Sequence, residues 1–182
     1  MTRTSLTSRQ IRVQVRPRLP GDLTACVDVL RSVHIADGYP AVWPTHPEKW
    51  IAPEKEQFAW VAVDVTGAVQ GHIALHAASD HDACDLWSKS SGLSPELIIA
   101  VARLFVAPCL RRHGIGRTLL DTATERAWAL GLQPVLDVGQ RNVAAARFYD
   151  ELGWRRVGRL DSRQIPILAY IGPVKAPIAA AR

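Results

Sequence analysis

The spacing of hydrophobic and polar positions predicts strands and helices along the chain. Residues 11–18 alternate apolar and polar side chains, as in a half-buried strand, and this run is ended by proline. Pro20-Gly21-Asp22 then opens a helix, with Asp22 as a suitable N-cap. The next segment, 39–53, is rich in proline and is expected to be a loop, although it carries two tryptophans.

The middle of the chain predicts a hairpin followed by a central strand. Apolar runs over 58–65 and 69–77 are separated by a short Thr-Gly-Ala turn. Residues 79–96 interrupt the apolar pattern with acidic residues, serine and glycine, and predict a polar connection. The nearly unbroken apolar run 97–106 indicates a strand buried on both faces.

The second half of the chain alternates helical and strand patterns. The predicted elements are a helix over 115–130 that ends before Gly131, a strand over 134–138, a helix over 142–152 with Asn142 as N-cap, and strands over 154–159 and 165–171. This alternation predicts an α/β fold (α+β by some schemes) with a mixed sheet. Because no repeat or linker is present, we expect one domain over 1–182, with loose termini at 1–10 and 173–182.

Composition is typical of a folded protein in a reducing compartment. The chain has 182 residues, of which 48% are hydrophobic and 21% charged, a balance typical of one globular domain. It has no apolar run long enough to cross a bilayer and no signal-peptide pattern, so we expect a cytoplasmic protein without a membrane partner. Its three separated cysteines form no CxxC pair, which argues against disulfides and a cysteine zinc site.

One stretch of the chain gathers residue types that can bind metals. It comprises His72, His76, Asp80, His81, Asp82, Cys84 and Asp85. On a strand, His72 and His76 would share a face but lie about 13 Å apart, too far to share an ion. We therefore interpret this cluster as a solvated polar loop and expect no metal. Cys109 lacks histidine and carboxylate partners at a recognisable spacing and is expected to be an inert turn residue.

The formal net charge of +5 comes mainly from arginines, and one arginine cluster adjoins a glycine turn. Residues 104–120 combine the end of the buried strand, a turn with Arg111 and Arg112, and Gly114-Ile115-Gly116 at the start of an amphipathic helix. Glycines let backbone N–H groups approach a ligand, and free amides at a helix N-terminus favour an anion. Together with Arg117, this arrangement predicts a cradle for phosphate groups.

Other phosphate-binding patterns fit less well. A dinucleotide fold places GxGxxG directly after a strand, whereas here Leu119 occupies the third glycine position and the turn is longer. Asp137 lies near the spacing of a ribose-binding carboxylate, so this alternative stays open. The chain contains no GxxxxGK[ST] run. A purely structural glycine turn would not account for the adjacent arginines.

A second motif lies at a separation that makes the two motifs informative together. It reads Asn142-x-x-Ala145-x-x-Phe148-Tyr149-x-x-x-Gly153-Trp154 and follows Leu-Phe-Val-x-Pro and Arg111-x-x-Gly114-x-Gly116. This combination resembles the GNAT superfamily of acyl-CoA-dependent N-acyltransferases, most strongly over 97–158. The resemblance implies a GNAT-like mixed, mostly antiparallel sheet, splayed between its fourth and fifth strands, 97–106 and 134–138, and flanked by helices. Acetyl-CoA would lie in the gap.

The resemblance also implies which residues hold acetyl-CoA. Backbone groups of 104–106 would pair with the pantetheine arm, and amides of 112–117 would hold the diphosphate. The full set is Leu104, Phe105, Val106, Arg111, Arg112, His113, Gly114, Ile115, Gly116, Arg117, Thr118, Asn142, Ala145 and Tyr149. The arginines of 155–163 lack the aromatic platform of a nucleic-acid site, so we interpret them as a solvated strand face or a contact to the 3′-phosphate.

Helical spacing independently places Asn142, Ala145 and Tyr149 on one face of a helix. The small side chain of Ala145 leaves room for a thin pantetheine chain. The phenol of Tyr149 is suited to act as a catalytic general acid toward the departing thiolate. Packing beside Phe148 is the alternative role for Tyr149.

The implied reaction is direct attack of a neutral primary amine on the thioester in a ternary complex, with a backbone N–H of 104–106 stabilising the oxyanion. The residue that accepts the amine proton is not identified. Where the family often has a glutamate, the strand reads Ile99-Ala-Val-Ala-Arg103. Glu96, His34, His72 and a water chain are the candidates.

We therefore predict an acetyl-CoA-dependent N-acetyltransferase that acts on a small-molecule or peptide amine and has no nucleic-acid partner; a homodimer is left open. A non-catalytic acyl-CoA-binding or sensing module and a nicotinamide-dependent oxidoreductase are the alternatives. Tyr39, Trp43, Trp50 and Trp60 are candidates for the acceptor pocket, with core or lid packing as their competing role.

Overall fold

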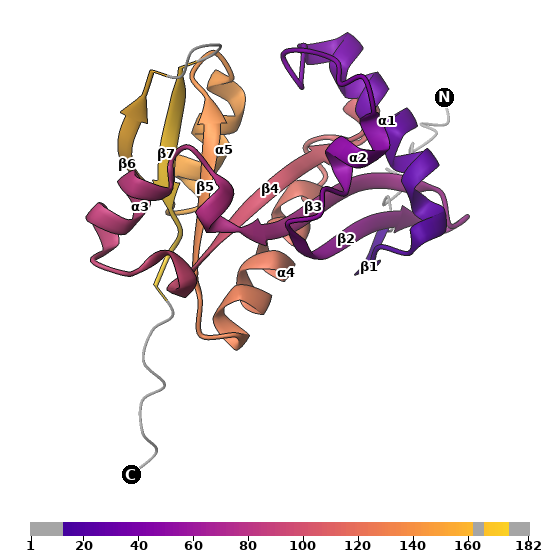
Figure 1. The fold of residues 1–182 in the computed structure, drawn as a ribbon. Helices are drawn as coiled ribbons and strands as arrows, with labels where there is room; N and C mark the ends of the chain where they lie inside the picture. Colours follow the sequence, from indigo (N-terminus) through magenta and orange to yellow (C-terminus); the bar gives the residue numbers. More distant parts are fainter. Residues whose placement is uncertain (1–12, 162–165, 175–182) are drawn as a thin grey trace, which may run out of the picture.

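The computed structural model describes residues 13–161 and 166–174, which form a seven-stranded sheet with helices on both faces (Figure 1). The helices are α1 (Leu23–Asp37), α2 (Pro47–Ile51), α3 (Cys84–Ser91), α4 (Ile115–Ala129) and α5 (Val143–Glu151). The strands are β1 (Val13–Pro17), β2 (Glu56–Asp64), β3 (Val69–Ala77), β4 (Ile98–Val106), β5 (Gln133–Gly139), β6 (Arg155–Leu160) and β7 (Ile167–Ile171).

The order of strands across the sheet is β1-β2-β3-β4-β5-β7-β6. Neighbouring strands are antiparallel throughout, except that β4 and β5 run parallel. The predicted hairpin is β2 and β3, and the predicted central strand is β4. The expected α/β class with a mixed, mostly antiparallel sheet is confirmed.

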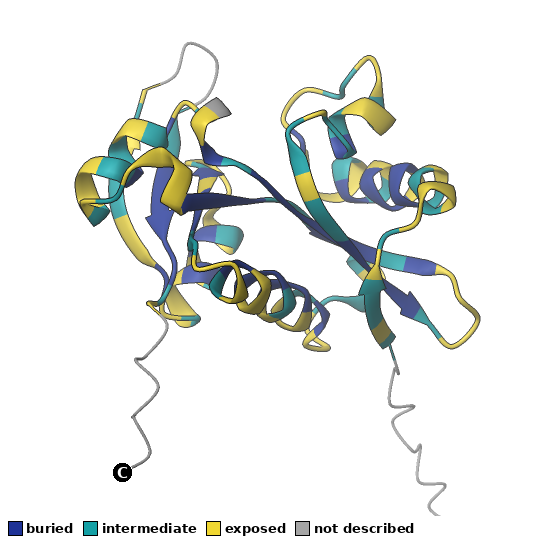
Figure 2. Cartoon of the chain, turned by 60° about the horizontal axis from the view of Figure 1, so that its bottom comes forward, coloured by how far each residue is buried: buried dark blue, intermediate teal, exposed yellow. Residues whose placement is uncertain are grey.

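The two faces of the sheet are covered by different helices. Side chains alternate along β3, so Ile73 packs with Leu119 of α4 on one face, where α5 also lies. On the other face, Leu30 of α1 packs on Val61 of β2, and Trp87 of α3 packs against β4, β5 and β7. Figure 2 shows the central strands mostly dark blue and the outer sides of the helices largely yellow.

The expected signals bound α4 and α5. Gly131 follows α4 with φ of 73°, in the left-handed region that glycine adopts without steric cost. The Asn142 side-chain oxygen accepts a hydrogen bond from the backbone N–H of Ala145 at 3.0 Å, which confirms the predicted N-cap of α5. Asp22 precedes α1 as expected, but its carboxylate binds Arg16 instead of capping the helix.

Three expectations from local pattern are wrong. The segment expected to be a polar connection contains α3, because the fully buried Trp87 anchors a short helix that its polar neighbours conceal in the sequence. Likewise, α2 forms within the expected loop. His72 and His76, assigned to a solvated polar loop, are fully buried on β3, because both sides of that strand are covered by other elements.

The expected loose termini lie outside the described residues, apart from 173 and 174, and Arg163 also lies outside them. No helix in the described segments combines the length and apolar content needed to cross a membrane.

Candidate active site

The parallel strands β4 and β5 pair over only a short stretch and then separate. Their pairing ends at Ala100 and Val135, after which β4 continues to Val106 bonded to β3, and β5 continues to Gly139 bonded to β7. Figure 1 shows the two strands diverging beyond this point. The edge of β4 that faces β5 therefore carries backbone groups without a strand partner, as at the edge of a sheet. The predicted splay between the fourth and fifth strands is confirmed.

Arg103 lies where β4 bulges beyond the last pair with β5. Its φ of 56° is in the left-handed region, and the pairing register with β3 shifts between His72 and Ala74. Non-glycine residues adopt this conformation rarely, and it costs about 1–3 kcal/mol unless the surroundings enforce it. The bulge therefore aims the Arg103 side chain in a direction that a regular strand would not give it.

His72 supports this bulge from the neighbouring strand. Its Nδ1 lies 3.0 Å from the main-chain oxygen of Arg103, so Nδ1 carries the hydrogen that this carbonyl accepts. Its Nε2 lies 3.1 Å from Nη1 of Arg18, which can only donate. Arg18 also binds both carboxylate oxygens of Glu56, at 2.6 and 2.9 Å. Burial lowers the pKa of His72 to about 3, so the ring is neutral and already used by two partners.

The turn into α4 presents backbone amides to one end of the splay. Arg112 and Gly114 have φ of 63° and 80°, and α4 begins at Ile115 directly afterwards. A Cβ added to Gly116 would point at Phe148, 3.6 Å away, and at Val106, 3.8 Å away. Gly116 therefore faces the space between α4, β4 and α5, and its lack of a side chain keeps that space wider.

The other residues of the predicted cradle divide into buried and exposed groups. Ile115 is buried in the core, so only its backbone can contact a ligand. Arg111 forms a two-point ion pair with Asp37 of α1 and so ties the turn to that helix. Arg112 and Arg117 form no ion pair within the described part of the chain. They are the guanidinium groups free to bind an anion.

Five further residues of the predicted set lie in the turn or on β4. His113 Nδ1 lies 2.8 Å from the main-chain oxygen of Arg111, and the Thr118 hydroxyl contacts that of Gly114 at 3.3 Å. Both contacts are local to the turn. In β4, Phe105 is buried and stacks on His72, with ring centroids 5.2 Å apart. Leu104 and Val106 pack partly on the core of the α4 face.

Tyr149 lies on α5 with its ring almost fully enclosed. The ring makes edge contacts with Phe148 and Trp154, at centroid distances of 5.3 and 5.9 Å, and a tilted contact with Tyr170 at 6.1 Å. Burial raises the pKa of Tyr149 above its usual value, with smaller contributions from Tyr39 and Asp137. The phenol therefore stays protonated at neutral pH and can donate its hydrogen.

Side chains from four separate segments lie near enough to Tyr149 or to one another to interact electrostatically. Tyr39 follows α1, Arg103 lies on β4, Asp137 lies on β5 and Tyr149 lies on α5. The charge of Asp137 acts on the pKa values of Tyr39, Arg103 and Tyr149, so these groups share one electrostatic environment. Sequence reasoning considered Asp137 only for a ribose and did not single out Arg103, because β4–β5 divergence is a long-range feature.

Two histidines with unsatisfied nitrogens lie near this group. Neither ring nitrogen of the buried His76 has a hydrogen-bond partner among the described residues, and Nε2 of His81 is equally unpaired. His81 Nδ1 lies 3.4 Å from an Asp137 carboxylate oxygen. The ring centroids of His76 and His81 lie 6.0 Å apart. Burial lowers the pKa of His76 to about 3.

The candidates for a base named from the sequence have other surroundings. Glu96 is exposed before Ile98, the first β4 residue to pair with β5, so it lies at the closed end of the splay. His34 uses Nδ1 to contact the main-chain oxygen of Pro40 at 2.8 Å. His72 is occupied as described above.

The structure separates the four aromatic candidates for an acceptor pocket. Tyr39 and Trp50 contact each other and adjoin Arg103, whose guanidinium carbon lies 3.6 Å from the centre of a Trp50 ring. Trp43 packs on His34, 5.3 Å away. Trp60 belongs to the core on the opposite, α4 face of the sheet, because side chains alternate along β2.

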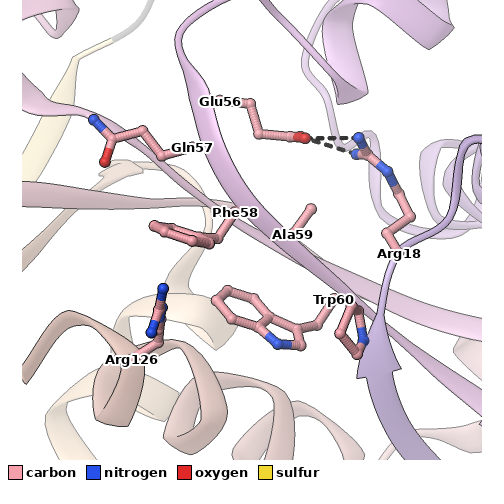
Figure 3. A pocket seen from close by; sticks show the side chains of 8 residues that line it. Arg18, Glu56, Gln57, Phe58, Ala59, Trp60 and Arg126 are labelled. Carbon is pink, nitrogen blue, oxygen red and sulfur yellow. Dashed lines mark hydrogen bonds and ion pairs between the residues drawn. The ribbon is translucent and has the colours of Figure 1, made fainter. Parts of the chain in front are cut away.

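A separate cavity lies at the beginning of β2 (Figure 3). It measures about 510 Å³ and is lined by Pro17, Arg18, Glu56, Gln57, Phe58, Ala59, Trp60 and Arg126. Figure 3 shows the Arg18–Glu56 ion pair on one side and Arg126 beside Phe58 on the other. None of the residues predicted to bind the cofactor lines it, so it is not the candidate active site.

Metal-ligand residue types do not converge in the described segments: no group of three or more could hold an ion. Cys109 is exposed in the turn before α4 and forms no disulfide. The arginines Arg155, Arg156 and Arg159 are exposed on β6, where Arg156 donates to the hydroxyl of Tyr170 at 3.2 Å. A solvated strand face fits their positions.

The splayed parallel strands, the glycine turn into α4 and the enclosed tyrosine of α5 together define an acyltransferase type of fold. The chain belongs to the GNAT acetyltransferase family, because the model of the acetyltransferase (GNAT) family matches residues 29–154. No curated protein gives a significant match.

Solved structures share the fold at low identity. NAA60 of Arabidopsis thaliana, in complex with acetyl-CoA, is 19% identical with a TM-score of 0.65, covering 88% of this chain and 97% of that one. The ribosomal-protein-S18-alanine N-acetyltransferase of Escherichia coli is 14% identical with a TM-score of 0.65, covering 94% and 99%. A GCN5-related N-acetyltransferase from Kribbella flavida is 17% identical with a TM-score of 0.63, covering 89% and 98%.

Proposed function

We propose that this protein is an N-acetyltransferase that uses acetyl-CoA as co-substrate and transfers the acetyl group directly to a primary amine. The observation that carries the proposal is the divergence of β4 and β5 beyond Ala100 and Val135, with the α4 turn at one end and Tyr149 beside it. Family membership supports acetyl transfer, and the neighbouring structure of NAA60 contains acetyl-CoA.

The residues of this chain fit the coenzyme at three places. The amides of the turn from Arg112 to Arg117 would hold the diphosphate, since the start of α4 offers unpaired N–H groups. The free edge of β4 over 104–106 would bind the pantetheine amides as an added strand does. Gly116, which has no side chain, and Ala145, which has a small one, would leave room for the coenzyme between the start of α4 and α5. When bound, the coenzyme supplies an acetyl group activated as a thioester.

Tyr149 has the chemical role of the acid. As the amine nitrogen bonds to the acetyl carbon and the carbon–sulfur bond breaks, the phenol provides the hydrogen that the departing sulfur takes up. Burial raises the pKa of Tyr149, which keeps this hydrogen in place before the reaction. A backbone N–H of 104–106 stabilises the negative charge that develops on the carbonyl oxygen.

The attacking amine must lose a proton, and Asp137 is our candidate for the group that receives it. It faces the splay from β5, and its pairing with His81 at 3.4 Å offers a second site to which the proton can pass. Glu96, by contrast, lies at the closed end of the splay. His34 is engaged with a backbone oxygen.

The test is turnover with a panel of primary amines that includes amino acids, polyamines and peptides. The purified protein and acetyl-CoA should release free thiol only when a suitable amine is present, and mass spectrometry should show the N-acetyl product. Gly116→Glu, which puts bulk and negative charge into the turn, is the inactive control. Coenzyme binding by calorimetry without transfer to any amine would instead support a binding module, and binding of NAD in place of the coenzyme would support an oxidoreductase.

A further inference from the structure

Arg103 is held rigidly at the mouth of the β4–β5 splay. Its Nε donates to the main-chain oxygen of Trp50 at 3.0 Å, and its guanidinium carbon lies over the Trp50 side chain, 3.6 Å from a ring centre. The Tyr39 hydroxyl adjoins the same guanidinium. Two residues, Trp50 and Tyr39, thus hold this cation in place, while the bulge at φ of 56° sets the direction of its side chain.

This cation has no anionic partner in the described part of the chain. Three other arginines do have a carboxylate partner: the enclosed Arg18 binds Glu56, and the more exposed Arg16 and Arg111 bind Asp22 and Asp37. No ion pair forms at Arg103, although its side chain is only partly exposed to water. Withdrawing a guanidinium from water without a counter-ion costs free energy. Such a group is therefore suited to bind an anionic ligand, which supplies the missing counter-ion.

The opposite charge lies across the splay and is not in contact with it. Asp137 on β5 acts electrostatically on Arg103 but pairs with His81. The site thus presents a cation on the β4 side and an anion on the β5 side, with Tyr149 beside them. A ligand that carries a carboxylate and an amine on neighbouring atoms matches both charges, since each group meets its opposite.

We propose that the acceptor is a small amino carboxylate, such as a free α-amino acid, whose carboxylate binds the guanidinium of Arg103 and whose amine faces Asp137. The inference rests on the proposed function, because it concerns the acceptor of that reaction. This proposal excludes the lysine side chains of peptides. It also favours a small molecule over a peptide N-terminus, because a peptide has an amide in place of the carboxylate next to its terminal amine. His72 acts on this step only by positioning Arg103 through its carbonyl.

The first experiment needs no mutation. We would measure kcat/KM of the purified protein for an amino acid series and, for each member, its carboxamide and its decarboxylated amine. The acids should exceed both partners by about 100-fold, because a buried guanidinium left without its anion disfavours the neutral analogue. Equal kcat/KM for acid and carboxamide would overturn the inference even if acetyl transfer is confirmed.

The second experiment removes the cation. Arg103→Met should lower kcat/KM for the acids by about 100-fold, mainly through KM, and change it for the carboxamides by less than about threefold. Arg103→Lys should fall between, because it keeps the charge without the two-point geometry. Arg126→Met is the matched control, since Arg126 also stacks on an aromatic ring, at 4.4 Å from the centre of Phe58, far from the splay residues. Equal losses for acids and carboxamides in Arg103→Met would contradict the role.

A binding measurement separates this inference from the proposed function. Calorimetry with the amino acid, in the presence of free coenzyme A, should detect binding to the unmodified protein and to Arg126→Met but not to Arg103→Met. If no amine is acetylated while this pattern holds, the proposed function fails and the amino carboxylate site stands. If amines are acetylated and the pattern is absent, only the amino carboxylate inference fails. Circular dichroism and coenzyme affinity establish that Arg103→Met is folded.

Discussion

The Nδ1–H of His72 donates to the main-chain oxygen of Arg103 across 3.0 Å, from a ring that is fully buried. Through the ring of His72, this bond connects the strained residue of β4 to the ion pair between Arg18 and Glu56, which lies toward the β1 edge of the sheet. The β4 bulge inside the β4–β5 splay is therefore supported by side chains from β2 and β3 and from the residue that follows β1. We expect the geometry of the site to depend on this support.

Substitution of His72 tests that dependence. In His72→Leu the Arg103 carbonyl and the Arg18 guanidinium both lose a buried partner, so the free energy of unfolding should fall by about 2–4 kcal/mol. His72→Gln keeps a side-chain N–H and an oxygen and should recover roughly half of that loss. Urea denaturation at neutral pH measures both. Equal stability of the two variants would show that the hydrogen bonds do not support the bulge.

Stability should fall as the solution becomes acidic, because two histidines are buried in their neutral form. Burial lowers the pKa of His72 and of His76 to about 3, whereas the unfolded chain protonates them near 6.5. As pH falls from about 6.5 toward about 3, the unfolded state therefore binds more protons, and each histidine reduces the free energy of unfolding by up to about 1.4 kcal/mol per pH unit.

Single variants identify this contribution in urea titrations between pH 7 and 4. His76→Leu should remove about half of the histidine-dependent slope of unfolding free energy against pH. It should leave stability at neutral pH unchanged or higher, because neither nitrogen of His76 has a hydrogen-bond partner that the substitution would leave unpaired. His46→Gln changes an exposed histidine and is the control. An unchanged slope in His76→Leu would mean that this histidine is not held neutral.

Tyr149→Phe separates chemistry from packing. The hydroxyl of Tyr149 forms no hydrogen bond with the described residues, so stability should change by less than about 0.5 kcal/mol while the ring contacts remain. The turnover number should fall by about 100-fold or more, with little change in the affinity for acetyl-CoA. Tyr170→Phe, which removes a neighbouring phenol, should stay near the original rate. A Tyr149→Phe rate close to the unmodified one would exclude the acid role.

The pH dependence of turnover provides a second check on Tyr149. Since burial raises the pKa of Tyr149, the phenol should not ionise below about pH 10, and the turnover number should show no loss from this group up to that pH. A decline between pH 8 and 9 that disappears in Tyr149→Phe would contradict this expectation.

Two glycines of the α4 turn should respond differently to alanine. Gly114 has φ of 80°, so Gly114→Ala should lose about 1–2 kcal/mol of stability even though no atom lies within 4 Å of the added Cβ. Gly116 is helical, and its Cβ would make ordinary contacts with Phe148 and Val106. Gly116→Ala should therefore keep or raise the stability while weakening acetyl-CoA binding about tenfold, as measured by calorimetry. Unchanged binding would move the coenzyme away from this turn.

Local pattern predicted much of this fold because each signal acts over a few residues. The apolar run of β4, the helical spacing of α4 and the side chain of Asn142, which binds the backbone three residues later, all express short-range physics. The small helix α3 escaped prediction because its stability comes from one buried side chain, Trp87, that packs on three strands distant in sequence.

The sequence by itself determined the order of the strands and of the helices α1, α4 and α5, the glycine turn before Ile115 and the position of Tyr149 one turn beyond Ala145. All of these follow from periodicity and neighbouring residues. Only the tertiary structure decided that Arg103, Asp137 and Tyr39 face one another and that His72 is buried beneath the bulge. The physical reason is that pairing of strands across the sheet and burial by distant helices set these relations. No local pattern of residues encodes which charges are left without a partner.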